Sequence, residues 1–199
     1  MAKPFSQACE NNKQPILNIL QTVFASSGTV LEIGSGTGQH AVFFAGHMPH
    51  LNWQTSDQHQ YHQGIKLWLD DARLNNLQDP LELDVSQPHW PVDEVDGVFS
   101  ANTLHIMSWS QVTQFFAGCE RILADQANLC VYGPFNYHGQ YTSESNAAFD
   151  QHLRLRDPAS GIRDFEAVDQ LARQAGLSLI KDYPMPANNR LLHWRKSSK

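Results

Sequence analysis

An apolar run that breaks into three alternating glycines constrains this chain more than any other feature. The segment spans residues 30–40 and reads VLEIGSGTGQH, after which helix-like spacing resumes. Glycine permits backbone angles that side chains disfavour, and it lets a ligand approach the main chain closely. The pattern therefore predicts an α/β protein in which a strand leads through a nucleotide-type binding loop, Gly34 to Gly38, into a helix.

Two kinds of nucleotide fit this loop. The spacing Gly36-x-Gly38-x-x-Ala41 matches the dinucleotide fingerprint, which favours a nicotinamide cofactor. Glu32 argues differently, because a carboxylate buried in a strand is costly unless a partner satisfies it. A cationic ligand satisfies it and a pyrophosphate is repelled by it. S-adenosylmethionine carries a sulfonium and an ammonium, so Glu32 favours this cofactor.

Further acidic side chains follow the next two apolar runs. Asp57 ends the run 51–57, where a carboxylate can accept hydrogen bonds from both ribose hydroxyls. Asp84 follows the third run, 81–84, at a position suited to the adenine amino group. Together with the glycine loop, these two residues predict a nucleoside site along one edge of a sheet.

The order of apolar runs predicts a parallel sheet. Strands are expected at 29–33, 52–57, 81–84, 95–100, 127–132, 177–183 and 190–195, with helices between most of them. An additional helix should precede the first strand, with Pro15 at its first position. The polar segment 133–145 is expected to form a lid or substrate loop. Ligands of such sheets bind at the carboxyl ends of the strands.

Composition limits the class of protein. A chain of 199 residues, 41% hydrophobic and 17% charged, is expected to form one domain over residues 1–199. The formal charge of −6 makes nucleic acid an unlikely partner. Three widely spaced cysteines predict reduced thiols, and no segment predicts a secretory signal or membrane span, so we expect a cytoplasmic protein. His59 and His62 lack matching ligands, so no metal is expected.

Over nearly its whole length the chain resembles the class I S-adenosylmethionine-dependent methyltransferases, and within them domain-of-unknown-function family 938. The segments that carry the resemblance are 32–40 (EIGSGTGQH), Ser56-Asp57, Leu83-Asp84-Val85, Asn102 with His105-Ile106, 132–135 (YGPF), 143–150 (SESNAAFD), 161–164 (GIRD) and 185–189 (MPANN). The resemblance implies a Rossmann-like fold with a seven-stranded, mostly parallel sheet, helices on both faces and an N-terminal helix. It also implies a cofactor site whose members are Asn12, Glu32, Gly34, Ser35, Gly36, Gly38, Asp57, Asp84, Val85 and Asn102.

Three residues are candidates for catalysis. Asn102 and His105 follow the fourth strand, which in this architecture lies beside the transferable methyl group. His105 is expected to act as a general base or to orient the acceptor, although a histidine that only lines the pocket explains the sequence equally well. Tyr132, close to Tyr137 and Tyr141, is expected either to wall the acceptor pocket or to belong to the core.

The sequence thus predicts a methyltransferase that uses S-adenosylmethionine on a small-molecule or protein acceptor. Two other functions stay open. One is a non-catalytic protein that binds S-adenosylmethionine and acts through a protein partner. The other is an NAD(P)-dependent oxidoreductase that uses Gly36-x-Gly38-x-x-Ala41, against which Glu32 argues.

Overall fold

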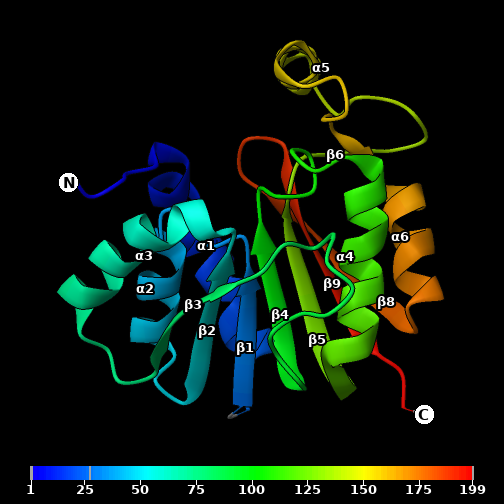
Figure 1. Cartoon of the computed structure of the whole chain (residues 1–199). Coiled ribbons are helices and arrows are strands. Elements are labelled where there is room, and N and C mark those ends of the chain that lie inside the picture. The colour runs from blue at the N-terminus through cyan, green and yellow to red at the C-terminus, as the bar shows by residue number, and fades with distance from the viewer. Residues whose placement is uncertain (1, 27, 199) are drawn as a thin grey trace.

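A seven-stranded sheet runs through the centre of the computed structural model, which describes residues 2–26 and 28–198 (Figure 1). Met1, Ser27 and Lys199 lie outside the described residues. The strands are β1 (Gly28–Ile33), β2 (Leu51–Asp57), β3 (Leu77–Glu82), β4 (Val95–Ala101), β5 (Leu123–Gly133), β8 (Leu177–Met185) and β9 (Asn189–Lys196). Their order is β3-β2-β1-β4-β5-β9-β8. Strand β9 runs antiparallel to β5 and β8, and the other pairings are parallel.

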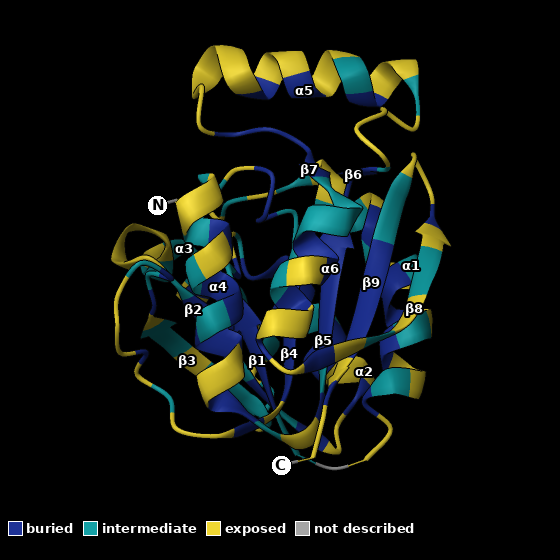
Figure 2. Ribbon diagram, turned by 90° about the vertical axis from the view of Figure 1, so that its right-hand side faces the viewer, coloured by how far each residue is buried: buried dark blue, intermediate teal, exposed yellow. Residues whose placement is uncertain are grey.

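Helices cover both faces of this sheet, as the sequence predicts. One face carries α1 (Gln7–Val23), α2 (Gln39–His47) and α3 (His59–Ala72), and the other carries α4 (Trp109–Ile122) and α6 (Phe165–Gln174) (Figure 1). Helix α5 (Glu144–Arg156) lies apart from these layers, above the carboxyl ends of the central strands, with much of its surface exposed (Figure 2). The structure is therefore the Rossmann-like class I methyltransferase fold.

Each face of the sheet has its own apolar core. Under α1 and α2, the rings of Phe44, Trp53 and Phe99 pack with centroids 5.4–5.9 Å apart, and all three are fully buried. Under α4 and α6, Phe116 packs edge-on against Trp194. Burial of such rings removes large apolar areas from water, which stabilises the three-layer arrangement.

The strand order reverses at the middle of the sheet, because β2 and β3 lie on one side of β1 and the later strands lie on the other. Strand β1 pairs with β2 on one side and with β4 on the other, so the carboxyl ends of these strands border a crevice. The glycine loop after β1 lies at this switch point. The sheet topology thus positions the predicted nucleoside site.

The third strand begins earlier than the sequence predicts. We expected it at 81–84, but β3 spans Leu77–Glu82 and Asp84 lies in the segment that follows. Pro80 interrupts the apolar pattern and cannot donate to a ladder, but β3 is an edge strand, where proline is tolerated. Tertiary pairing with β2 therefore outweighs the weak local preference of these residues.

The first helix also begins earlier than predicted. Pro15 was expected at its first position, but α1 starts at Gln7 and contains Pro15 in its interior. Ser6 caps the helix by accepting a hydrogen bond from the backbone N–H of Cys9. The first two turns are polar, so hydrophobic periodicity gave no sign of them.

The predicted lid segment is more regular than a loop. It contains β6 (Phe135–Asn136), which pairs with β7 (Arg163–Asp164), and a bridge between Tyr137 and Gln140. Helix α5 follows it, and its buried residues are Asn146, Asp150 and Leu153. Within the described part of the chain, none of the helices combines the length and apolar character needed to cross a membrane.

Candidate functional site

The glycine loop exposes its backbone to a cavity at the crevice. Gly36 has φ +57°, and a Cβ built on it would have no atom within 4 Å. Gly34 has φ +77°, and a Cβ there would lie only 2.6 Å from Thr103 Cγ2. Glycine at 34 is therefore required for packing, whereas glycine at 36 leaves room for a ligand against the main chain.

Asp57 lies directly across the loop. Its Oδ2 accepts a hydrogen bond from Gly36 N–H at 2.7 Å, and its Oδ1 accepts one from Gln58 N–H at 2.8 Å. Burial raises the pKa of the Asp57 carboxyl, and the two N–H donors oppose this effect. The carboxylate is thus held rigidly at the tip of β2, where it lines the cavity.

The loop amides are already engaged within the protein. Gly34 N–H and Ser35 N–H donate to Ser56 O, and Gly38 N–H donates to Ser35 O. With Gly36 N–H bound to Asp57, four of the five backbone N–H groups from Gly34 to Gly38 have protein acceptors. A phosphate-binding loop presents such amides to its ligand, so this loop is poorly suited to an anion.

Glu32 is buried beneath the loop, and its partners differ from our expectation. We expected a cationic ligand to satisfy it, but Ser35 Oγ donates to Glu32 Oε2 at 2.9 Å and Trp53 Nε1 donates to the same oxygen at 3.2 Å. The side chain is only 2% exposed. Burial raises the pKa of the Glu32 carboxyl to about 7 despite these two donors.

The end of the third strand contributes a polar and an apolar side chain. Asp84 Oδ1 accepts hydrogen bonds from Ser86 N–H at 2.9 Å and Ser86 Oγ at 2.7 Å. Val85 is buried and lines the cavity next to Asp84. A carboxylate beside an apolar surface suits a purine ring with an exocyclic amine.

The residues after β4 form the opposite wall. Asn102 adopts φ +60°, and its N–H donates to Tyr132 O at 2.8 Å. His105 is 7% exposed and lines the cavity. Burial, together with the positive charge of Arg163, lowers the pKa of His105 to about 4. The imidazole is therefore neutral at physiological pH and able to accept a proton.

These walls enclose a cavity of about 850 Å³, within the range of small-molecule sites. Most of the predicted site residues line it. They are Gly34, Ser35, Gly36, Asp57, Asp84, Val85, Asn102 and His105.

The four other predicted residues support this wall from behind. Glu32 binds Ser35, and Gly38 N–H donates to Ser35 O. Asn12 Oδ1 lies 2.6 Å from Nε2 of His40, a ring that lines the cavity. Tyr132 is buried in the core on the α1 and α2 side, with its carbonyl bound to Asn102.

Several lining residues were not among the predicted site residues. They come from the start of α1 (Ser6, Ala8, Cys9), from α5 (Ser145, Asn146, Phe149) and from the turn between β8 and β9 (Ala187, Asn189). These segments are distant from the glycine loop in sequence. The resemblance segments 143–150 and 185–189 contain the last two of these groups, so the family signature was the signal that could have found them.

Tyr137 and Tyr141, which the sequence grouped with Tyr132, are not among the residues that line the cavity. Tyr137 donates to Asp182 Oδ2 at 2.6 Å, and Tyr141 donates to Asp150 Oδ2 at 2.8 Å. Both hydroxyls therefore hold the segment around α5 in place. The described residues contain no group of three or more histidine, cysteine or acidic side chains arranged for a metal ion.

Comparison with known sequences identifies one family over almost the entire chain. The sequence model of the family described as "Protein of unknown function (DUF938)" matches residues 3–196.

Solved structures of methyltransferases share the fold. An O-methyltransferase family protein from Burkholderia thailandensis is similar with a TM-score of 0.83 and 17% identity, covering 94% of this chain and 56% of its own. The S-adenosylmethionine-dependent methyltransferase SibL gives 0.80 and 19%, covering 96% and 56%. CalO1, a methyltransferase in calicheamicin biosynthesis, was solved in its SAH-bound form and gives 0.73 and 17%, covering 93% and 54%. The chain spans just over half the length of these structures.

Proposed function

The chain belongs to the DUF938 family and has the class I methyltransferase fold, and from this premise we propose that it is an S-adenosylmethionine-dependent methyltransferase. The acceptor is a small molecule or a protein side chain. Two of the similar structures support the choice of cofactor, since one is described as S-adenosylmethionine-dependent and the other holds SAH, the product that remains after methyl transfer.

The arrangement of Gly36 and Asp57 carries this proposal. The loop has the open backbone of a nucleotide site, but a carboxylate occupies the position where a pyrophosphate would need free amides. A dinucleotide would bring negative charge against Asp57 and Glu32. A nucleoside that has no phosphate and carries positive charge avoids this repulsion, and S-adenosylmethionine is such a molecule.

The residues around the cavity fit this cofactor. Asp57 is placed for the ribose hydroxyls, and Asp84 with Val85 is placed for adenine. The open space at Gly36 admits the ligand against the main chain. Burial raises the pKa of Glu32 to about 7, and a cation in the cavity would favour its ionised form beneath the loop.

S-adenosylmethionine supplies a methyl group already activated by its sulfonium, so the protein has to position the acceptor and exclude water. Asn102 and His105 are the candidates for this task, because both line the cavity after β4. His105 lines the cavity in its neutral form, in which it can orient the acceptor or accept its proton, although burial and Arg163 make it a weaker base than a free imidazole. Tyr132 contributes through its carbonyl, which holds the Asn102 backbone.

Calorimetric titration with S-adenosylmethionine, S-adenosylhomocysteine and NADH tests the proposal. We expect the first two ligands to bind and NADH not to bind. Asp57→Ala should weaken S-adenosylhomocysteine binding about tenfold or more, equivalent to about 1.4 kcal/mol. Asp79→Ala, on the exposed side of β3, removes a carboxylate outside the cavity and serves as the matched control.

The alternatives give different results in the same titration. Binding of NADH without S-adenosylmethionine would establish a nicotinamide site and refute the proposal. Binding of S-adenosylmethionine with no methyl transfer to any acceptor in a broad screen would favour a non-catalytic protein that acts through a partner.

A further inference from the structure

Charge is distributed unevenly along the cavity. Among its described lining residues, the carboxylates are Asp57 and Asp84, and no lysine or arginine is present. Asp57 ends β2 and Asp84 follows β3, so both carboxylates lie on the nucleoside side. The other side of the cavity, beyond β4, is lined by His105, Ile106, Met107, Pro134, Asn146 and Phe149, which we call the acceptor half. His105 is neutral, so the acceptor half carries no formal charge.

The charged groups behind the acceptor half do not favour a cation. Arg163 is buried, and its guanidinium donates to the carbonyl oxygens of Leu104, Met107 and Ala159. Its positive charge reaches the acceptor half, as the lowered pKa of His105 shows. Asp150 is neutralised by Arg154, with Nε and Oδ2 2.8 Å apart. An ammonium group here would lose its hydration and meet no carboxylate.

An anion lacks a partner as well. The donors of Arg163 described above are directed to carbonyl oxygens, which leaves the guanidinium engaged inside the protein. A carboxylate in the acceptor half would therefore be desolvated without a direct ion pair. Neither sign of charge therefore finds a charged side chain to pair with among the described residues that line the acceptor half.

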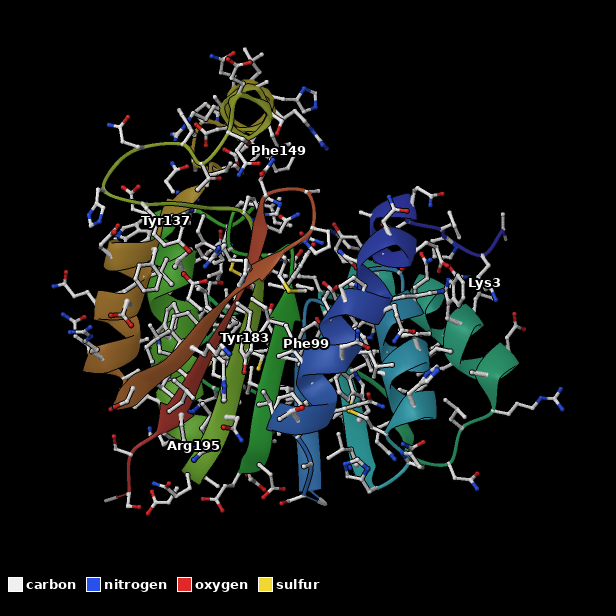
Figure 3. The ribbon with its side chains drawn as sticks, turned by 180° about the vertical axis from the view of Figure 1, so that it is seen from behind. Lys3, Phe99, Tyr137, Phe149, Tyr183 and Arg195 are labelled. Atoms are coloured by element: carbon white, nitrogen blue, oxygen red, sulfur yellow. The ribbon has the colours of Figure 1, made fainter. Side chains whose placement is uncertain are left out.

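The acceptor half instead presents apolar and aromatic surface. Phe149 is 39% exposed and Ile106 is 58% exposed, although both are large hydrophobic residues. Figure 3 shows Phe149 on the side of α5 that faces the rest of the molecule. Asn146 Nδ2 donates to Asn188 O at 3.2 Å, which links α5 to the turn between β8 and β9 above the cavity. Exposed apolar side chains under such a cover are typical of a site for an apolar ligand.

We propose that the acceptor is a small, uncharged molecule with an aromatic ring and a hydroxyl group, bound in the acceptor half beside Phe149 and His105. This inference rests on the proposed methyltransferase function. The ring packs against Phe149 and Ile106, and the hydroxyl faces the imidazole. The hydroxyl proton passes to a ring nitrogen of His105 while the acceptor oxygen bonds to the methyl carbon. The electron pair of the broken carbon–sulfur bond stays on sulfur, which becomes a neutral thioether.

Three probes of similar shape and different charge test this inference. The protein is saturated with S-adenosylhomocysteine at pH 7.5 and titrated calorimetrically with 2-naphthol, 2-naphthylmethylamine and 2-naphthoate, which are neutral, cationic and anionic. We expect 2-naphthol to bind at least tenfold more tightly than either charged probe. With S-adenosylmethionine, we expect the methyl group on the naphthol oxygen.

Substitutions on α5 tie this selectivity to the site. Phe149→Ala should weaken 2-naphthol binding at least fivefold and leave S-adenosylhomocysteine binding unchanged. Phe149→Glu should shift the preference toward 2-naphthylmethylamine, because it introduces the missing carboxylate. Leu155→Ala on the same helix is the control, since Leu155 is 86% exposed and does not line the cavity.

The outcomes separate this inference from the proposed function. Three results would overturn the inference. They are binding of a charged probe as tight as or tighter than that of 2-naphthol, no binding of 2-naphthol, and 2-naphthol binding that Phe149→Ala leaves unchanged. If S-adenosylhomocysteine binds and a lysine-rich peptide is methylated in place of 2-naphthol, the acceptor class is wrong and the methyltransferase function stands. If S-adenosylhomocysteine does not bind, both fail.

Discussion

The ring of Phe149 packs edge-on against the imidazole of His105, with centroids 5.3 Å apart and ring planes at 72°. This contact joins α5 to the segment after β4. Apolar burial contributes little to holding α5 in this position, since Leu153 is the one apolar side chain among its buried residues. Polar anchors also hold it, and the Asp150 carboxylate accepts three hydrogen bonds.

Removing this anchor should release α5. Asp150 accepts hydrogen bonds from Tyr141 Oη, Arg154 Nε and Ile162 N–H. Asp150→Ala leaves the buried Ile162 N–H without an acceptor, at a cost of about 1–3 kcal/mol. We expect faster hydrogen exchange across residues 141–163, with the central sheet unchanged. Glu144→Ala, at an exposed position of α5, should leave exchange as it is; the same protection in both variants would show that Asp150 is not the anchor.

Alanine at two glycines of the loop should have separable effects. Both positions have positive φ, so each substitution strains the backbone by about 1–2 kcal/mol. Gly34→Ala adds a clash with Thr103 and should lower the melting temperature further. Gly36→Ala places its Cβ in open space and should mainly weaken S-adenosylhomocysteine binding, at least tenfold. Calorimetry and thermal melting check both. A Gly36→Ala protein with wild-type affinity would mean that no ligand approaches this backbone.

Glu32 should destabilise the ligand-free protein at high pH. Its folded pKa of about 7 lies above the unfolded value of 4.5, so the native state holds its proton more tightly. Stability therefore falls as pH rises from 4.5 through 7, and above pH 7 the cost reaches roughly 3 kcal/mol. Glu32→Gln removes the charge and keeps an oxygen acceptor for Ser35 and Trp53.

Urea unfolding at two pH values checks this expectation. Glu32→Gln should raise the free energy of unfolding at pH 8 by up to about 3 kcal/mol and change it little at pH 5. Glu94→Gln, at an exposed carboxyl, is the control. A gain at pH 5 equal to that at pH 8 would contradict the assignment to ionisation of Glu32.

The free energy of unfolding should fall steeply as the pH is lowered. Burial lowers the pKa values of His40, His105 and His193 to about 4, below the unfolded value of 6.5. Their contribution to stability is present above pH 6.5 and is lost as pH falls toward 4. Three protons give the free energy of unfolding a slope of about 4 kcal/mol per pH unit. Glu32 titrates in the opposite sense and reduces this slope to about 3 kcal/mol per pH unit.

One of these histidines can be removed without touching the cavity. His193 lies in β9 with Nε2 2.9 Å from Asn128 Oδ1. His193→Gln should reduce the slope of unfolding free energy against pH by about 1.4 kcal/mol per unit between pH 6 and 5. His138→Gln, at an exposed position, is the matched control. An unchanged slope in His193→Gln would place the acid sensitivity elsewhere.

The glycine loop and the acidic residue at the end of β2 could be anticipated because they depend on short stretches of sequence. The three glycines have positive φ, and Gly36 N–H donates a hydrogen bond to Asp57. The partners of Glu32 were not predictable in this way. Trp53 reaches Glu32 from the neighbouring strand, and only the pairing of β1 with β2 brings them together.

The acceptor half was harder to predict because its residues come from distant segments. Phe149 meets His105 because α5 lies above the sheet, held by hydrogen bonds among Asp150, Tyr141, Arg154 and Ile162. No periodicity in the sequence records such contacts. The early starts of α1 and β3 have a similar origin, since tertiary pairing orders polar turns and a proline-containing edge that local preference leaves unmarked.

The alternation of strands and helices in the main sheet, the glycine loop and the acidic residues at or after the ends of β2 and β3 could be read from the sequence, because these depend on short-range periodicity and on backbone angles. The sequence left open which residues support the cavity and which line it, and that its carboxylates lie on one side. Those properties depend on distances between segments that are far apart in the chain, and packing of the two cores against the sheet sets these distances.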